Sequence, residues 1–119
     1  MFNFENLIVW RKAVDFSTVI YNLTGKFPKE EIFVLSSQFR RAADSIILNI
    51  AEGSGNSSKK EFVRFIDYAI RSGYECIGCL DIATELEYLT LKKHQELFEK
   101  LDEIIAMLVG LRKSIVNRD

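Results

Sequence analysis

The sequence predicts an all-α fold, an antiparallel up-down-up-down four-helix bundle in which residues 1–119 form a single domain. Apolar residues recur three and four positions apart along four long segments, a spacing that places them on one face of a helix. Short connections separate the segments and favour antiparallel packing around one shared core. The 119 residues include only one proline and six glycines, which leaves room for long uninterrupted helices.

The first predicted helix spans residues 6–25. Asn6 is a favourable N-cap residue, and Gly25 is a favourable residue just beyond the C-terminal end. The main apolar stripe consists of Val9, Ala13, Phe16, Ile20 and Leu23. A second set beside it consists of Leu7, Trp10, Val14 and Tyr21.

The second predicted helix lies between Pro28 and Gly53. The chain is interrupted at Pro28, because the residue before a proline avoids the helical region. The pattern does not settle whether residues 29–35 form a separate turn, with Ser36 or Ser37 capping the main helix. The buried stripe consists of Phe39, Ala43, Ile46 and Ile50, with Arg40 and Arg41 on its flank.

The third predicted helix follows the loop of residues 53–57 and runs from Ser58 to about Tyr88. Ser58 and Glu61 have the spacing of a capping box, in which each side chain satisfies the other's backbone amide. The stripe of this helix consists of Phe62, Ile66, Ala69, Gly73, Cys76, Leu80 and Ala83. Thr90 is a candidate cap for a fourth helix, whose stripe consists of Leu97, Leu101, Ile104, Leu108, Leu111 and Ile115.

The first and fourth helices carry more apolar residues than one core-facing stripe needs. In the fourth helix the second set consists of Phe98, Ile105, Val109 and Val116. Such residues leave apolar surface on a monomer that a homo-oligomer would cover. In the alternative interpretation they only widen the core of the monomer.

The composition limits the classes of protein to which this chain can belong. The net charge is −1 and the pI is about 5.9, so nucleic-acid binding requires a local basic patch. The N-terminus lacks the pattern of a signal peptide, and no run of about 18 apolar residues occurs. Two cysteines provide no disulfide framework. We therefore expect a cytoplasmic protein without a membrane span.

The chemistry-bearing residues do not assemble into a known catalytic pattern. Cys76-x-x-Cys79 lies in the middle of a helix, where buried structural thiols are the usual case. The single histidine, His94, follows Leu91 by three positions, so the Glu-x-x-His pairs of a di-metal bundle are missing. The segment Gly53-Ser54-Gly55 lacks the sequence of a phosphate-binding loop. We expect no catalytic residue, cofactor, metal or small-molecule substrate, and hence an interaction or assembly protein.

Basic residues concentrate around the hairpin between the second and third helices. They are Arg40, Arg41, Lys59, Lys60, Arg64 and Arg71. On a shared face they would neutralise phosphates and bind RNA or DNA. Alternatively, the interleaved Glu52, Glu61 and Asp67 pair with them in solvent.

Gly73 and Gly78 each cost a helix interior up to about 1 kcal/mol relative to alanine. Such a cost usually indicates that another backbone approaches closely. With Cys76 and Cys79 they form a strip of small residues, against which either a helix of the same chain or a second subunit could pack.

Several motifs run in the order of a known family. They are Leu7-x-Val9-Trp10-x-x-Ala13, Tyr21, Phe27-Pro28-x-x-Glu31, Leu35-x-x-Gln38-x-Arg40-Arg41-Ala42, Ser45-Ile46, Asn49-Ile50-Ala51-Glu52-Gly53, Ser58-x-x-Glu61-Phe62, Phe65, Ala69, Ser72 and Glu75. The chain resembles the bacterial four-helix-bundle proteins encoded in intervening sequences of 23S ribosomal RNA genes, also labelled S23 ribosomal proteins. It is also similar to the accessory variability determinant protein of diversity-generating retroelements.

The resemblance implies a homopentamer that binds nucleic acid or a nucleic-acid-processing protein such as a reverse transcriptase. The matched residues expected to build the bundle or its subunit contacts are Trp10, Tyr21, Pro28, Arg41, Asn49, Glu52, Gly53 and Glu75. Asn49 is expected to find hydrogen-bond partners on neighbouring helices and so to fix their register. Leu48 replaces a proline that many relatives carry, so the second helix should lack a kink. The basic character of the retroelement relative is missing.

Overall fold

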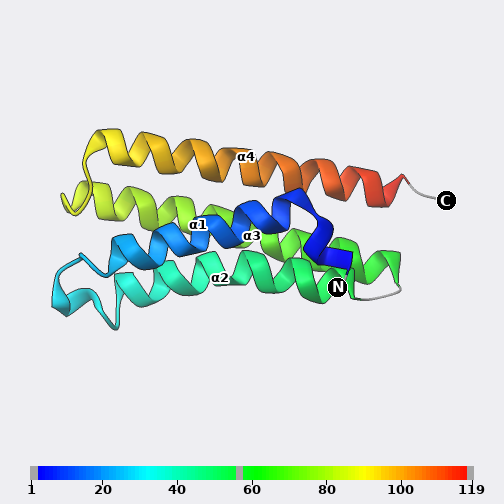
Figure 1. Ribbon diagram of the computed structural model, residues 1–119, viewed down its shortest axis with the longest axis horizontal. Coiled ribbons are helices and arrows are strands. Elements are labelled where there is room, and N and C mark those ends of the chain that lie inside the picture. Colours follow the sequence, from blue (N-terminus) through cyan, green and yellow to red (C-terminus); the bar gives the residue numbers. More distant parts are fainter. Residues whose placement is uncertain (1–2, 56–57, 118–119) are drawn as a thin grey trace.

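The computed structural model describes residues 3–55 and 58–117, and these form four long helices and two short 3-10 helices. They are η1 (Asn3–Asn6), α1 (Ile8–Thr24), η2 (Lys29–Glu31), α2 (Leu35–Ser54), α3 (Lys59–Glu85) and α4 (Leu91–Val116). Consecutive α-helices run in opposite directions along a rod of 49 × 23 × 22 Å (Figure 1). The predicted all-α, up-down four-helix bundle is confirmed. None of these helices is long and apolar enough to cross a membrane.

The start of α1 differs from the prediction. The helix begins at Ile8 with Leu7 as its N-cap, so the predicted capping by Asn6 is wrong. The chain first turns through η1, and the Leu7 amide donates a 3.0 Å hydrogen bond to the Phe4 carbonyl. The ring of Phe4 then lies 5.4 Å from that of Trp10, centroid to centroid. We attribute the later start of the helix to this aromatic contact.

At its other end α1 stops where the sequence predicts. The last helical residue is Thr24, and Gly25 is the C-cap. Gly25 has a φ of −61°, so it does not adopt the left-handed conformation for which glycine is favoured at helix ends.

The connection to α2 contains the separate turn that the sequence leaves open, in the form of η2. Neither Ser36 nor Ser37 caps α2, because the helix begins earlier, at Leu35, with Val34 as N-cap. The Leu35 amide lies 3.5 Å from a carboxylate oxygen of Glu31, which takes the part of a cap. Ser36 is buried instead. The main helix then runs without a break through the position where relatives have proline.

Two predicted caps are confirmed. The Ser58 hydroxyl accepts a hydrogen bond from the Glu61 amide at 3.3 Å, and the Thr90 hydroxyl accepts one from the Lys93 amide at 3.1 Å. Part of the loop before α3, residues 56–57, lies outside the described residues. Each cap satisfies an amide that has no partner within its own helix.

The end of α3 comes earlier than the predicted Tyr88. The Tyr88 amide donates to the Ala83 carbonyl at 2.9 Å and the Glu87 amide donates to the Thr84 carbonyl at 3.0 Å. This pair of hydrogen bonds is a Schellman motif. It places Glu87 at a φ of 64°, a conformation that usually requires glycine. The sequence offers no glycine signal there, and this explains the error.

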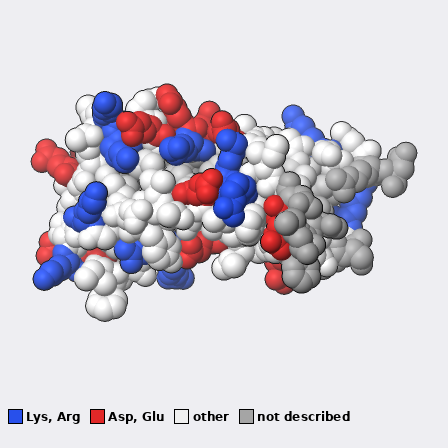
Figure 2. All heavy atoms as spheres, in the orientation of Figure 1, with Lys and Arg blue, Asp and Glu red and all other residues white. Residues whose placement is uncertain are grey.

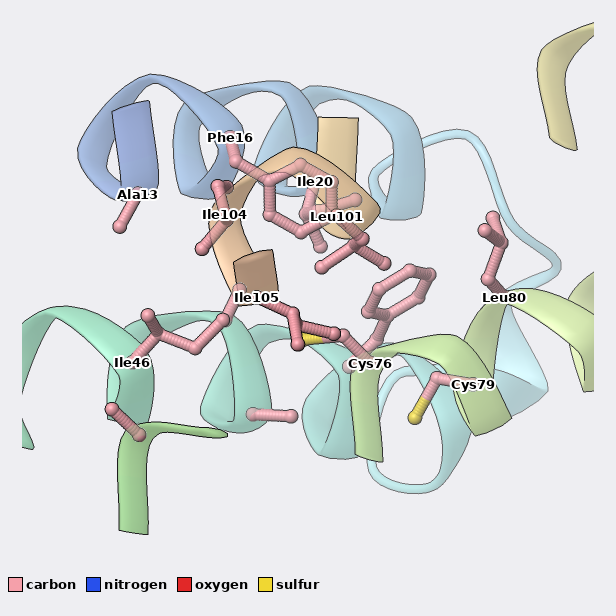
Figure 3. Packing of buried hydrophobic residues seen from close by; sticks show 14 of the residues in the cluster. Ala13, Phe16, Ile20, Ile46, Cys76, Cys79, Leu80, Leu101, Ile104 and Ile105 are labelled. Atoms are coloured by element: carbon pink, nitrogen blue, oxygen red, sulfur yellow. The ribbon is translucent and has the colours of Figure 1, made fainter. Parts of the chain in front are cut away.

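Side chains from all four helices form one apolar core. In Figure 3, Phe16 and Ile20 of α1 lie beside Leu101 of α4, and Ile46 of α2 and Cys76 of α3 point into the same space. The predicted stripes are buried, apart from Leu23, Phe62 and Leu111, which are half-buried. Each large side chain buried here contributes about 1.5–3 kcal/mol.

The two cysteines are free thiols inside this core, 0% and 2% exposed at Cys76 and Cys79. Burial, aided by the negative charge of Glu75, raises the pKa of Cys79 to about 11. Burial also raises the pKa of Cys76. Both are therefore packed as small apolar side chains, as predicted for structural thiols.

Gly73 lies where α4 crosses α3. A Cβ atom at this position would be 2.8 Å from Cγ1 of Ile105. The close approach predicted at Gly73 is therefore made by a helix of the same chain.

Replacing Gly73 with alanine should lower the free energy of unfolding by about 1–3 kcal/mol, because the new methyl group overlaps Ile105. Gly110 is the matched control, since it lies in α4 with no atom within 4 Å of a built Cβ. Gly110→Ala should raise the free energy of unfolding by about 0.5–1 kcal/mol. Urea denaturation at one protein concentration measures both, and equal effects would contradict this account.

The thiols should react slowly with a disulfide reagent at pH 8, because the thiolate is the nucleophile and the raised pKa values keep both groups protonated. Reaction in denaturant should be rapid for both cysteines. In the folded protein the rate should rise as the pH approaches about 11, the pKa of Cys79. A thiol that reacts as fast in folded protein as in denaturant would contradict the assignment.

Candidate interaction surface on α2 and α3

Exposed apolar side chains gather over α2, the segment before it, and α3. They are Ile32, Phe33, Val34, Leu48, Tyr74, Ile82 and Leu86. Phe33 is 92% exposed and Leu48 is 66% exposed. Apolar residues of this size usually become covered in a complex.

This location corrects the expectation of apolar surface along the first and fourth helices. Most of their second stripes pack against the core, as in the alternative of a wider monomer core. Exposed apolar residues of α1 and α4 occur only in the first or last turns of the described helices. They are Ile8, Tyr21, Leu91 and Val116.

An open groove of about 770 Å³ lies within this surface. Phe33 and Val34 line one end, and Leu48 lines it further along α2. Arg41 of α2 and Glu75 of α3 also line it. Asp44 lines it too, so the groove combines exposed apolar side chains with one basic and two acidic residues.

The charged motif residues lie on the surface. Arg41, Glu52 and Glu75 are all exposed. Within the described part of the chain these three side chains make no hydrogen bond or ion pair. Their exposure places them outside a polar interior, and their role in subunit contacts stays a prediction.

Asn49 is half-buried, and its partners are on its own helix. Its amide nitrogen donates to the Ser45 carbonyl at 2.8 Å and to the Ser45 hydroxyl at 2.9 Å. The prediction of direct partners on other helices is therefore wrong. The link to α3 is made one residue further along, because the Ser72 hydroxyl lies 2.8 Å from that of Ser45.

Arg40 turns away from the other basic residues, towards α1. Its Nε donates to the Thr24 hydroxyl at 2.7 Å and one terminal nitrogen donates to the Tyr21 carbonyl at 3.1 Å. Its guanidinium carbon also lies 4.8 Å from the centre of the Tyr21 ring. These contacts hold α2 against α1 and leave little of this side chain for a phosphate.

The same α1–α2 contact uses Asp44. Its two carboxylate oxygens accept hydrogen bonds from the Ser17 and Tyr21 hydroxyls, each at 2.7 Å. The hydrogen bond to Asp44 raises the pKa of Tyr21. Tyr21 therefore takes part in the contact between α1 and α2.

Three other motif residues lie at a helix contact, at a turn and against the core. Gly53 is buried, and a Cβ atom there would lie 2.8 Å from Cβ of Phe65, so only glycine lets α2 approach α3 here. Pro28 is the N-cap of η2, with a φ of −54°. Trp10 packs on the core, and its buried ring nitrogen has no hydrogen-bond partner among the residues that the structure describes.

The basic residues of α3 surround Tyr68. The guanidinium carbons of Arg64 and Arg71 lie 5.5 Å and 5.6 Å from the centre of the Tyr68 ring. Arg64 also pairs with Glu61, as the alternative of solvated ion pairs predicts. Asp67 pairs instead with Arg112 of α4, at 2.6 Å.

Lys59 and Lys60 lie in the first turn of α3 and are exposed. Five of the six predicted basic residues thus lie on α2 or α3 away from α1, and Arg40 does not join them. On the face drawn in Figure 2, positive and negative side chains are interspersed, so that face shows no continuous basic patch.

His94 lies at the surface of α4. Its Nε2 is 2.7 Å from a carboxylate oxygen of Asp81, and its ring stacks on Phe98. Among residues 3–55 and 58–117, no group of three or more His, Cys, Asp or Glu side chains could hold a metal ion.

Sequence reasoning missed the exposed apolar residues of α2. Leu48 lies between Ile46 and Ile50 of the buried stripe, and two residues along a helix is about 200°, which points it away from the core. That signal was available. Phe33 gave none, because the structure of residues 29–35 could not be settled from the pattern.

Comparisons with known proteins agree with this fold. Residues 5–110 match the family model of the 23S rRNA-intervening sequence protein. No curated protein matches the chain. A crystal structure of a protein of unknown function from the S23 ribosomal protein family of Bacteroides thetaiotaomicron matches with a TM-score of 0.83 and 27% identity, covering 89% of this chain and 96% of that one. The chain belongs to the 23S rRNA-intervening sequence protein family.

Proposed function

We propose that this chain is a non-enzymatic assembly protein of the cytoplasm, which forms a homo-oligomer and binds a macromolecular partner. The observation that carries the proposal is the exposed apolar surface on α2 and α3. The side chains of Phe33 and Leu48 are largely exposed to water in the single chain. A second copy that covers them would remove this apolar area from water, which is favourable.

The chemistry of the titratable side chains supports a non-enzymatic role. The thiols of Cys76 and Cys79 are buried with raised pKa values, the reverse of what a nucleophilic cysteine needs. His94 is held by Asp81 at the surface. Free buried thiols also agree with a reducing compartment.

A ring of five copies is the assembly that the family resemblance implies. Five-fold closure requires two different patches on each subunit, since each copy contacts a neighbour on either side. The exposed residues of α2 and those of α3 provide two such patches. The partner held by the assembly would be RNA, DNA or a nucleic-acid-processing protein.

Light scattering on the full chain at micromolar concentration should give a mass close to five times the 13.7 kDa of one chain. The mass should fall on dilution if the apolar surface drives association. A constant mass of 13.7 kDa across the concentration range would refute homo-oligomer formation. Another closed multiple would refute only the number five.

A second candidate function is binding of RNA or DNA through α3. The arrangement of Arg64 and Arg71 around the Tyr68 ring favours it, because cationic side chains beside an aromatic ring suit both phosphates and stacked bases. Lys60 extends the same side of the helix. The interleaved Glu61 and Glu75 oppose it.

Binding of a labelled ribosomal RNA fragment should weaken steeply between 50 and 200 mM salt, by roughly tenfold or more for a few phosphate contacts. Reversing the charges of Lys60 and Arg71 together should make the slope of log affinity against log salt concentration shallower by about two. Lys92→Glu is the matched control, since Lys92 is an exposed residue of α4. Fluorescence anisotropy measures all three proteins, and a flat wild-type titration at low salt would refute this function.

A further inference from the structure

The hydrogen bond between Ser45 and Ser72 fixes how α2 and α3 are aligned along the rod. Their hydroxyl oxygens are 2.8 Å apart, so the two residues lie at the same height. The helices are antiparallel, and each residue advances about 1.5 Å along its helix. Residues before Ser45 are therefore level with residues after Ser72.

Outward-facing residues of α2 form a stripe at helical spacing. It begins with Val34, the N-cap of α2, and continues through Arg41 and Leu48 to Glu52. Ser45 lies at the same spacing but is half-buried and hydrogen-bonded to Ser72 of α3. Val34 and Leu48 are 62% and 66% exposed, so the order of chemical types along the stripe is apolar, positive, apolar, negative.

Outward-facing residues of α3 form a corresponding stripe. Read from the same end of the rod it consists of Ile82, Glu75, Arg71, the half-buried Tyr68 and Arg64, with Leu86 just beyond the end of the helix. Ile82 and Leu86 are about half exposed, at 52% and 49%. The order of types is apolar, negative, positive, aromatic, positive.

The two stripes match at most heights. Arg41 lies about 6 Å from Ser45, and Glu75 about 4.5 Å from Ser72 in the same direction. In the opposite direction along the rod, Leu48 lies about 4.5 Å from Ser45, and Tyr68 lies about 6 Å from Ser72.

The outer positions match as well. Towards the start of α2, Val34 lies about 16 Å from Ser45 and Ile82 lies about 15 Å from Ser72, measured along the rod. Towards the opposite end, Glu52 lies about 10 Å from Ser45 and Arg64 lies about 12 Å from Ser72. Apolar residues are level with apolar or aromatic ones, and each charge except Arg71, which lies near the level of Ser45, is level with its opposite.

Rotation about an axis parallel to the helices leaves every height unchanged. In a closed assembly with such an axis, α2 of one copy therefore meets α3 of the next in the same register as inside the subunit. We infer that this is the interface between copies: the outer stripe of α2 packs antiparallel on the outer stripe of α3 of its neighbour, with Arg41 paired to the neighbour's Glu75. This inference rests on the proposed homo-oligomer and names its contact.

Gly78 supports the same contact. It lies in α3 between the levels of Glu75 and Ile82, and no atom lies within 4 Å of a built Cβ. A helix-interior glycine costs up to about 1 kcal/mol, and none of the described residues of the subunit fills the space that it leaves. A neighbouring α2 can approach α3 closely at this point.

Charge identifies the occupant as a second copy. A nucleic acid placed along these stripes would bring phosphates against Glu52 and Glu75, which is unfavourable. A second copy instead provides the opposite charge at both heights. Arg41, Glu52 and Glu75, which form no ion pair with the described residues of their own chain, would then each gain one.

The test is a charge exchange read out by the mass of the assembly. Arg41→Glu alone and Glu75→Arg alone should each raise the dissociation constant of the oligomer by about tenfold or more, because each places like charges together. The double variant Arg41→Glu/Glu75→Arg should restore most of the association. Sedimentation of each variant over a dilution series gives the constants.

Two exposed residues of α4 provide matched controls. Lys92→Glu and Asp102→Arg change the net charge by the same amounts away from both stripes, and association should be unchanged. Helix content by circular dichroism confirms folding, which the exposed positions of Arg41 and Glu75 should preserve. Leu48→Asp should also weaken association, since it puts a charge into the apolar part of the contact.

The outcomes separate this interface from the proposed function. If the wild-type chain is an oligomer and the single reversals leave its mass unchanged, the interface lies elsewhere while assembly stands. A double variant that associates no better than the single variants refutes the Arg41–Glu75 pairing. A monomeric wild-type chain overturns the interface and the assembly together.

Discussion

The packing of α2 against α3 is the contact on which the rest of this structure depends. It needs a glycine at position 53, because any side chain there would meet Phe65. It also needs the Ser45–Ser72 hydrogen bond, which aligns the two antiparallel helices. Once this pair is set, α4 closes on α3 at Gly73 and α1 closes on α2 through the polar contacts of Arg40 and Asp44. Apolar packing supplies the stability, and these few polar and glycine contacts fix the alignment.

Polar residues of the family motifs divide into two groups once they are placed in space. Tyr21 and Arg40 hold α1 to α2 inside the subunit. Arg41, next in sequence to Arg40, is rotated by about 100° around the same helix and is exposed without a partner in the described chain. Two adjacent residues of one motif thus have different surroundings. A substitution at Arg40 tests the contact between α1 and α2, whereas a substitution at Arg41 tests the proposed binding surface.

The periodicity of apolar residues sufficed for the fold, since a helix interior is determined by burial every three or four residues. It also sufficed for caps whose hydroxyl is the first polar group before a helix, at Ser58 and Thr90. It failed where a distant contact decides. Examples are the Phe4–Trp10 contact ahead of α1 and the left-handed Glu87 after α3, a conformation for which glutamate carries no local preference. The burial of the second apolar stripes of α1 and α4 escaped prediction for a similar reason. Whether a second apolar stripe is buried depends on the rotation of each helix about its own axis relative to its neighbours. The spacing of apolar residues in the sequence does not determine that rotation.

The proposed contact between copies would also explain why the chain is nearly neutral yet locally charged. A protein that assembles through a purely apolar stripe would associate in any register, because hydrophobic contact has no direction. Charges placed at different heights remove that freedom, since only one register brings Arg41 level with an acidic residue while Leu48 remains covered. Charges of one sign would serve a polyanion better, and the presence of both signs on α2 favours a protein surface as the partner. On this view the acidic members of the motif, Glu52 and Glu75, are what directs the apolar surface of α2 and α3 towards copies of the same chain.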